Sequence, residues 1–510
     1  MYDKKIDREK LLEGMEMEKH EAPKFKEPVT PPFSLPLLWS GLLSVFSVAN
    51  PFLSSLATNL QSQNLYAGWA MAQGDVMYGQ IYGTSGLLYY LLNWLSNLAF
   101  GPIVMAVVQF ICLWFAGRFL FQIAYQLMHK ENLAKQVLHL FYLLALGLGL
   151  GGFYASLFAF PVVFAGIYFI LRYVAGEAED KSFVGFGALL AALFLLDPLT
   201  ALMFATLAFL VLMVYNIWSK KFAHGLYQWL ASILGFSIVF YPLGYITVLN
   251  GTFGLAISQI TYPLESLSVG SHVLNHAPLY LGLGMGLGVF TAIVGSLSGA
   301  KKELEIVLQI FSSLAVVAVL LFSLFLPEDG AYHLLPVLPF LMVLIAIWLG
   351  KEGYAKRGRH SSRAEQTHSV FGAYFKKNLL LPVLALLYLI VYPIANHYAF
   401  LVSEGKERAQ AAAYIKAEAK SGDRIYAWDK TAHLYQESGH LSASALLTPS
   451  LYGDTAENRL ILAQAITQNH PVYILVHRDL PLLADVQKEL KESYQEENLE
   501  LDHFTLYKLK

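Results

Sequence analysis

The stretch 61–91 reads QSQNLYAGWAMAQGDVMYGQIYGTSGLLYYL and joins two long apolar segments. It contains a single acid, Asp75, and no Lys or Arg, and it is rich in Tyr, Gly and Gln. It belongs to a connection over 56–100, and a length of about 45 residues is unusual for a connector in a compact domain. The stretch therefore predicts either a functional surface or a set of structured anchors.

Two amphipathic helices are expected inside this connection. The apolar face of the first is formed by Leu65, Gly68, Trp69 and Ala72, and the second carries leucines at 87, 88, 91, 92, 95 and 98. Helices with such faces lie in the interface of a membrane. The turn-rich segment between them carries Tyr78 and Tyr82, and tyrosine suits a site that is part apolar and part wet. Two interpretations stay open, namely interface anchors or a surface cleft for a lipid-linked substrate.

The composition of the chain is that of a membrane protein. Of its 510 residues, 56% are hydrophobic and 14% are charged, whereas soluble proteins carry about 25% charged residues. The apolar residues recur in runs of about 18–25 residues between Leu35 and Phe400, and each run can cross a bilayer as a helix. The net charge of −2 argues against a nucleic-acid partner. The single cysteine, Cys112, excludes an intrachain disulfide.

We predict a mainly α fold, a polytopic membrane helix bundle of about eleven spans. The spans are expected at 35–55, 102–127, 134–152, 154–174, 183–197, 199–217, 226–249, 275–297, 305–326, 333–350 and 379–400. With a cytoplasmic N-terminus, the basic residues fall on one side, at 130, 135, 172, 181, 220, 221, 301, 302 and throughout 351–377. The loops 61–100, 250–273 and 327–333 on the other side hold no Lys or Arg.

Three regions follow from this topology. A cytoplasmic tail covers 1–33, the membrane domain with its long first outer loop covers 34–401, and a polar region covers 402–510. The last region alternates helical and strand-like patterns, including the strand-like segments RIYAW and PVYILVH. We therefore expect a small extracytoplasmic α/β domain.

The loop, one span and the C-terminal region together resemble the GT-C glycosyltransferases, in the branch with protein O-mannosyltransferases and aminoarabinose lipid A transferases. In the loop, 74–78 matches a Gly-x-x-x-Tyr element of that branch. The segment AYHLLPVLPFLMVLIAIWLG resembles a family segment at the membrane entrance through His333, Pro336 and Pro339. The segments SGDRIYAWD and HPVYILVH resemble the outer domain of bacterial members.

The resemblance implies an enzyme that moves a sugar from a polyprenyl-phosphate carrier to an extracytoplasmic acceptor in the bacterial plasma membrane. An acid in the first outer loop would deprotonate or orient the acceptor. Where the family usually has its acids, this chain has Gln63 and Asn64, and an amide does not act as a general base. Asp75 is then the first candidate for the acidic residue that deprotonates or orients the acceptor. Glu265, Asp329 and Asp197 are the alternatives for this role, and the last possibility is that the activity is lost.

Other candidate residues lie near the ends of the predicted spans. Asp197 either caps the next helix, with Pro198 at its first position, or belongs to a functional site, because an ionisable group at that depth is costly. Glu265 and the pair Glu328–Asp329 are solvated loop acids or turn residues, or else substrate ligands. His333 either makes a structural hydrogen bond or, as the resemblance implies, contacts the substrate phosphate.

A phosphate group needs positive charge or hydrogen-bond donors. The sequence offers histidines at 272, 276, 333 and 397, together with Arg424 and Lys430 from the C-terminal region. No cofactor is predicted, and a divalent metal held by acids such as Asp75 and Glu265 is the alternative. The sequence names neither the sugar nor the acceptor.

Two other functions are consistent with the membrane architecture. A lipid-carrier transporter or flippase would need ionisable residues deep within its spans, and Arg118 and Asp197 are the main ones here. A non-catalytic relative that binds lipid-linked sugar is favoured by the amides at Gln63 and Asn64. Glycosyl transfer is the primary prediction.

Overall fold

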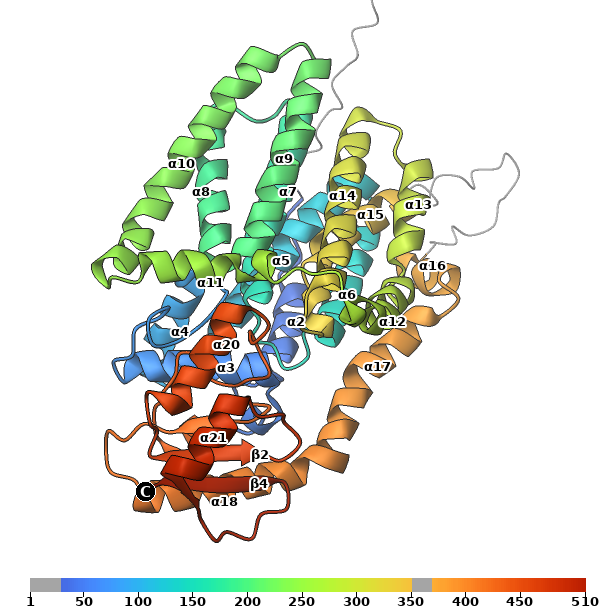
Figure 1. Ribbon diagram of the computed structural model, residues 1–510. Coiled ribbons are helices and arrows are strands. Elements are labelled where there is room, and N and C mark those ends of the chain that lie inside the picture. Colours follow the sequence, from blue (N-terminus) through green and yellow to red (C-terminus); the bar gives the residue numbers. More distant parts are fainter. Residues whose placement is uncertain (1–28, 351–368) are drawn as a thin grey trace, which may run out of the picture.

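The computed structural model describes residues 29–350 and 369–510 (Figure 1). Most of the expected tail over 1–33, and most of the basic segment over 351–377, lies outside the described residues. The described chain is mainly helical, with one four-stranded sheet near its C-terminus.

A bundle of apolar helices forms the first and larger part of the chain. Its members are α2 (Ser34–Val45), α5 (Ile103–Met128), α6 (Glu131–Leu148), α7 (Ala155–Val174), α8 (Ser182–Leu196), α9 (Pro198–Trp218), α10 (Phe222–Leu249), α12 (Ser271–Gly286), α13 (Val289–Gly299), α14 (Glu303–Phe325), α15 (Val337–Gly350), α16 (Val370–Lys377) and α17 (Leu381–Asn396). Among the described residues, six helices are long and apolar enough to cross a membrane, or seven if α12 and α13, bent by 45°, form one span. The chain is thus a mainly α membrane protein, and the count of about eleven spans stays a prediction.

The first expected span, 35–55, is much shorter in the structure. Helix α2 ends at Val45, and turns and the 3₁₀-helix η1 (Ser54–Leu56) follow. Asn50 precedes Pro51, and a proline disfavours helical backbone at the residue before it and has no N–H for the helix ladder. The apolar run was therefore longer than the helix that it could form.

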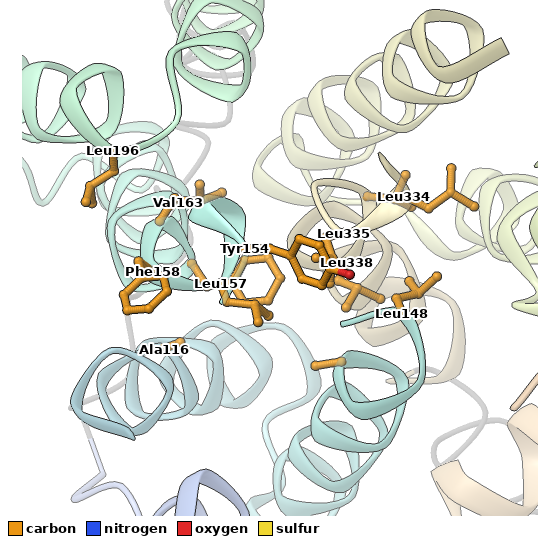
Figure 2. Close-up of a cluster of buried hydrophobic side chains, with 14 of the residues drawn as sticks. Ala116, Leu148, Tyr154, Leu157, Phe158, Val163, Leu196, Leu334, Leu335 and Leu338 are labelled. Carbon is orange, nitrogen blue, oxygen red and sulfur yellow. The ribbon is translucent and has the colours of Figure 1, made fainter. Parts of the chain in front are cut away.

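The interior of the bundle is filled by large apolar side chains. Helix α15 is buried along nearly its whole length, because almost every one of its side chains is apolar. Figure 2 shows part of this core, where Tyr154, Leu157 and Phe158 of the α7 region lie near Leu335 and Leu338. By contrast, α10 and α17 carry many exposed apolar side chains, as helices facing lipid do.

The long loop 56–100 contains two helices, as expected, α3 (Asn59–Ala72) and α4 (Leu87–Ala99). Helix α3 begins with a capping box between Thr58 and Gln61. Contrary to the expectation of an interfacial helix, α3 is buried on its polar face as well as its apolar face. The C-terminal region covers it: Ala432 N–H donates to Ser62 Oγ (3.0 Å), and Ser442 N–H donates to the Tyr66 hydroxyl (2.9 Å).

Helix α17 leads into the C-terminal region through a five-residue π-helical segment, η3 (His397–Leu401), and helix α18 (Val402–Glu418). The sheet has the order β1-β2-β4-β3, formed by β1 (Tyr426–Trp428), β2 (Tyr473–His477), β4 (Phe504–Leu509) and β3 (Tyr494–Glu496). Strands β1 and β2 are parallel, and β4 is antiparallel to both of its neighbours. A crossover therefore joins β1 to β2, and it contains α19 (His433–Ser438) and α20 (Ala456–Thr467), whereas α21 (Ala484–Ser493) follows β2.

Candidate active site

Two cavities lie between the helix bundle and the C-terminal region. Cavity 1 has a volume of about 410 Å³ and is lined by parts of α9, α14 and α11 (Phe253–Glu265), with Leu451 and Tyr452 from the C-terminal region. Cavity 2 has a volume of about 660 Å³ and is lined by parts of α6 and α17, with Lys430 and Asp454 from the C-terminal region. The C-terminal region thus contributes residues to both cavities.

The two cavities share part of their walls. Five residues line both of them: Leu60, Tyr154, Glu328, Tyr332 and Leu451. The rings of Tyr154 and Tyr332 are stacked, with centroids 5.0 Å apart and planes at 10°. Two rings in this arrangement form part of the wall that both cavities share, and Glu328 lies on the same wall.

Glu328 is a carboxyl group held by donors from two distant segments. Its Oε1 accepts a hydrogen bond from the Tyr262 hydroxyl (2.9 Å) and another from the backbone N–H of Tyr452 (3.2 Å). Burial raises the pKa of Glu328 above its ordinary value, although the hydrogen bond from Tyr262 opposes this shift. A carboxylate with a raised pKa is a stronger base when it is ionised.

Asp197 caps helix α9, as one of its two interpretations expected, and it also lines cavity 1. Its carboxylate accepts hydrogen bonds from Ser156 Oγ (2.7 Å), from Thr200 Oγ1 (2.9 Å) and from the backbone N–H of Thr200 (3.2 Å). Pro198 occupies the first position of the helix. These three donors fix the orientation of the carboxylate.

His333 lies in the 3₁₀-helix η2 (Ala331–Leu334) and lines cavity 1. Burial, with a smaller contribution from nearby His276, lowers the pKa of His333 to about 3. The imidazole is therefore neutral near pH 7 and provides a single N–H donor. This agrees with a hydrogen-bonding role for His333 but not with a positive charge beside a substrate phosphate.

Cavity 2 contains Asp329 and the only Lys or Arg among the described residues that line either cavity, Lys430. Lys430 Nζ lies 3.1 Å from Glu404 Oε1 and 3.5 Å from Asp479 Oδ2. In the described parts of the chain, the one group of three residues arranged to hold a metal ion is Glu404, His477 and Asp479. Lys430 already supplies positive charge to two of these carboxylates, and neither Asp75 nor Glu265 belongs to the group.

Four predicted site residues line neither cavity. Asp75 is buried and pairs with Arg424, whose Nη2 lies 2.5 Å from Asp75 Oδ1. Tyr78 is buried and donates to the Ser85 carbonyl (2.8 Å), and Tyr82 accepts a hydrogen bond from Asn458 Nδ2 (3.0 Å). Glu265 is exposed and accepts from Thr261 Oγ1 (2.7 Å).

Tyr82 does not line cavity 1, but it packs against two tyrosines that do. Its ring packs against Tyr452 and Tyr262, with centroid separations of 5.2 and 6.1 Å, and both of these tyrosines line the cavity. Asn64, where an acid was expected, lines cavity 1 and donates from Nδ2 to the Phe153 carbonyl (3.2 Å). The position of the missing acid is therefore on the cavity wall.

Sequence reasoning interpreted Glu328 mainly as a turn residue and gave no role to Tyr154, Tyr262, Tyr332 or Tyr452. One feature of the sequence could have indicated Glu328 as a site residue: it is an acid that lies directly before a span, in a loop without Lys or Arg. The tyrosines had none, because they come from separate segments that only the fold brings together.

Known proteins resemble the chain in fold and in sequence. The crystal structures of ArnT from Cupriavidus metallidurans, one bound to undecaprenyl phosphate and one in the apo state, each have a TM-score of 0.55 and 13% sequence identity with this chain. Each likeness covers 93% of this chain and 97% of ArnT, so the chain shares the fold of these two structures. No match was found among curated proteins.

Two family descriptions match consecutive parts of the sequence. Residues 21–401 match "Putative competence-induced protein Ccs4 N-terminal domain", and residues 405–510 match "Putative competence-induced protein Ccs4 C-terminal domain". Because the first match alone covers well over half of the 510 residues, the chain belongs to the Ccs4 family.

Proposed function

We propose that the protein is a membrane glycosyltransferase that moves a sugar from a polyprenyl-phosphate carrier to an acceptor on the membrane face that carries the C-terminal domain. The observation that carries this proposal is Glu328, a carboxyl group on the wall shared by two cavities. A transferase needs a base between two substrates, and this wall provides one. The ArnT fold, in a structure bound to undecaprenyl phosphate, supports a lipid carrier as one substrate.

Cavity 2 is the better place for the carrier. A phosphate group needs a cation or several donors, and Lys430 provides a cation at this cavity. The wall formed by α6 and α17 includes Leu148, Leu389 and the half-exposed Tyr388, which suits an isoprenoid chain that enters from the membrane. Cavity 1, with Asp197 and Ser156, would then receive the acceptor hydroxyl.

The reaction would be an inverting displacement at the anomeric carbon. Ionised Glu328 takes the proton of the acceptor hydroxyl, the acceptor oxygen bonds to the anomeric carbon, and the bond to the phosphate oxygen breaks. Polyprenyl phosphate leaves with the bonding electron pair, and Lys430 stabilises the negative charge that develops on it. Asp197 would orient the acceptor through Ser156.

Glu328 replaces Asp75 as our candidate for the base. The Asp75 carboxylate is buried against Arg424 and lines neither cavity, so an acceptor in cavity 1 would not reach it. Tyr78 and Tyr82 support the site, and Glu265 is not assigned a role. Asp329, on the wall of cavity 2, is proposed to contact the sugar.

We place the enzyme in a bacterial plasma membrane with a cytoplasmic N-terminus and an outer C-terminal domain. The distribution of lysine and arginine supports this orientation, because the loops on the cavity side hold none over 61–100, 250–273 and 327–333. The acceptor would be a polymer, lipid or protein of the cell surface.

A second candidate function is favoured by one observation. Asn64 occupies the cavity position where related enzymes have an acid, and its amide does not titrate. The protein would then bind a lipid-linked sugar without transferring it. Glu328 distinguishes the two functions, because binding alone does not need a base.

The test measures release of polyprenyl phosphate from polyprenyl-phosphate sugars by the purified full chain in lipid nanodiscs, with cell-surface acceptors added. Glu328→Gln should lower turnover by about 10²-fold or more, which is the contribution of a general base. Glu265→Gln is the matched control, since Glu265 is exposed and outside both cavities. Unchanged turnover in Glu328→Gln would remove Glu328 from the mechanism, and donor binding without transfer to any acceptor would favour the second function.

A further inference from the structure

A third cavity lies at the opposite end of the helices from the C-terminal domain. Cavity 3 has a volume of about 850 Å³ and is formed by the C-terminal ends of α5, α7 and α9 and the N-terminal ends of α10 and α14. In Figure 1 the connection from α9 to α10 lies at the end of the molecule far from the sheet. The proposed reaction does not involve this cavity.

The basic residues of cavity 3 come from two separate connections. Lys221 lies between α9 and α10, and Lys301 and Lys302 lie between α13 and α14. Within the described residues, neither Lys221 nor Lys301 has an acid within ion-pair distance. Lysines at this membrane end are expected in general, but here three exposed lysines line the same open cavity.

The acids of the same cavity are already occupied. Asp180 Oδ1 is 2.9 Å from His224 Nε2 and accepts a hydrogen bond from Gln228 Nε2 (2.8 Å). Glu305 Oε2 accepts the backbone N–H groups of Lys301 (2.9 Å) and Lys302 (3.2 Å). These hydrogen bonds hold both carboxylates in place, and among the described residues neither carboxylate lies within ion-pair distance of Lys221 or Lys301.

Two charged residues, Glu303 and Lys302, also line cavity 3. Glu303 is the first residue of α14, where the helix N-terminus stabilises an acid. Lys302 Nζ lies 3.4 Å from His129 Nε2, so a second titratable basic group faces this lysine. This distance is within the range of a hydrogen bond, and it places the Lys302 ammonium at the wall of the cavity.

The sides of cavity 3 face lipid. On α9, the residues next to the cavity include Val214, Ile217 and Trp218, which are 67%, 54% and 69% exposed. On α10, Leu226 and Leu230 are also exposed. An amphiphile could therefore place its acyl chains along these helices and its polar group in the cavity, with the Trp218 ring at the level of the headgroups.

From this arrangement we infer that cavity 3 binds the phosphate headgroup of an anionic phospholipid, through Lys221, Lys301 and Lys302. The shared chemistry is a phosphate group, and the exposed apolar faces of α9 and α10 favour a lipid as its source over a soluble phosphate. Basic pockets between membrane helices bind anionic headgroups in this manner. The inference is independent of the proposed transfer reaction.

The experiment titrates the detergent-solubilised full chain with phosphatidylglycerol or phosphatidylcholine and counts bound lipid by native mass spectrometry. The wild type should prefer phosphatidylglycerol. The triple variant Lys221→Gln, Lys301→Gln, Lys302→Gln should bind it more weakly, on the order of tenfold or more, while the corresponding triple Arg variant keeps the preference.

A matched control removes the same charge from the same end of the bundle. Lys135→Gln, Lys181→Gln, Lys220→Gln changes three lysines that do not line cavity 3, of which Lys135 and Lys181 pair with glutamates at 2.6 Å. Equal weakening in the control and the cavity variant would overturn the inference, as would equal affinity for the two lipids. Displacement of the lipid by millimolar inorganic phosphate would overturn the lipid assignment in favour of a soluble phosphate ligand.

Discussion

Removing either partner of the ion pair between Asp75 and Arg424 should lower the stability of the protein, by an amount that depends on which partner is removed. The Arg424 guanidinium contacts both oxygens of Asp75 (2.5 and 3.3 Å) and donates to the Ser442 carbonyl (2.6 Å). The side chain of Asp75 is 3% exposed, whereas that of Arg424 is 37% exposed. The pair joins the first loop of the bundle to the C-terminal domain.

The two single variants should therefore differ. Arg424→Ala leaves a carboxylate buried without its cation, and we expect a loss of about 3 kcal/mol in the free energy of unfolding. Asp75→Asn leaves an arginine that reaches water and an amide oxygen that still accepts a hydrogen bond, so we expect a loss of about 1–2 kcal/mol. In the double variant the two losses should not add, and the coupling should be about 1.5–3 kcal/mol.

The assay is denaturant unfolding of the full chain in detergent, followed by tryptophan fluorescence, combined with the sugar-transfer measurement. Both single variants should lower stability while residual transfer follows the folded fraction. Additive losses, or a larger loss in Asp75→Asn than in Arg424→Ala, would refute the structural interpretation. Loss of transfer in stable Asp75→Asn, with full transfer in Arg424→Ala, would restore Asp75 as the catalytic base.

Three further predictions concern other parts of the molecule. In the proposed mechanism the ionised form of Glu328 is the base, and burial raises its pKa, so kcat/KM should fall as the pH drops through this raised value. Tyr262→Phe removes a hydrogen bond that lowers this pKa and should therefore move the acid limb of the pH profile to higher pH; an unmoved limb would exclude Glu328 as the base. Burial first, and Arg408 second, lower the pKa of His433 in the C-terminal domain to about 4. The unfolded state therefore binds more protons, and the free energy of unfolding should fall between about pH 6.5 and 4 by up to about 1.4 kcal/mol per pH unit. In thermal unfolding scans, His433→Gln should reduce this dependence on pH. A Cβ at Gly187 of α8 would collide with a backbone carbonyl of α10, so Gly187→Ala should lower the melting temperature, whereas Gly185→Ala, where the structure has open space, should not.

Much of the bundle was predictable because long apolar runs leave few alternatives to a membrane helix. Helices α5, α7, α9 and α14 each fall within a few residues of an expected span. The missed break comes after Val45, before the Asn50–Pro51 step, and beyond it the Val48 N–H donates to the carbonyl of distant Gly151 (2.7 Å) instead of continuing the helix. The environment of α3 was not predictable, because its polar face contacts a domain that lies several hundred residues further along the chain.

In the candidate site, too, contacts between segments that are distant in the sequence were not predictable. Asp197 and His333 were identified because an ionisable group at the end of a span is a local feature of the sequence. The partners of Glu328 were not, since Tyr262 and Tyr452 are far from it in sequence and contact it only after the C-terminal domain has packed on the bundle. The ion pair of Asp75 was not predictable for the corresponding reason, because its partner Arg424 comes from that same domain.

The contribution of the C-terminal domain to both cavities has a consequence for biosynthesis. Lys430, Leu451 and Tyr452 leave the ribosome after every membrane helix has been made, so a nascent or truncated chain has neither cavity complete. Helices α17 and α18, joined through η3, then bring this last segment to its position over α3. Maturation of the candidate site is thereby tied to synthesis of the C-terminal region, and a copy without that region would have both cavities incomplete.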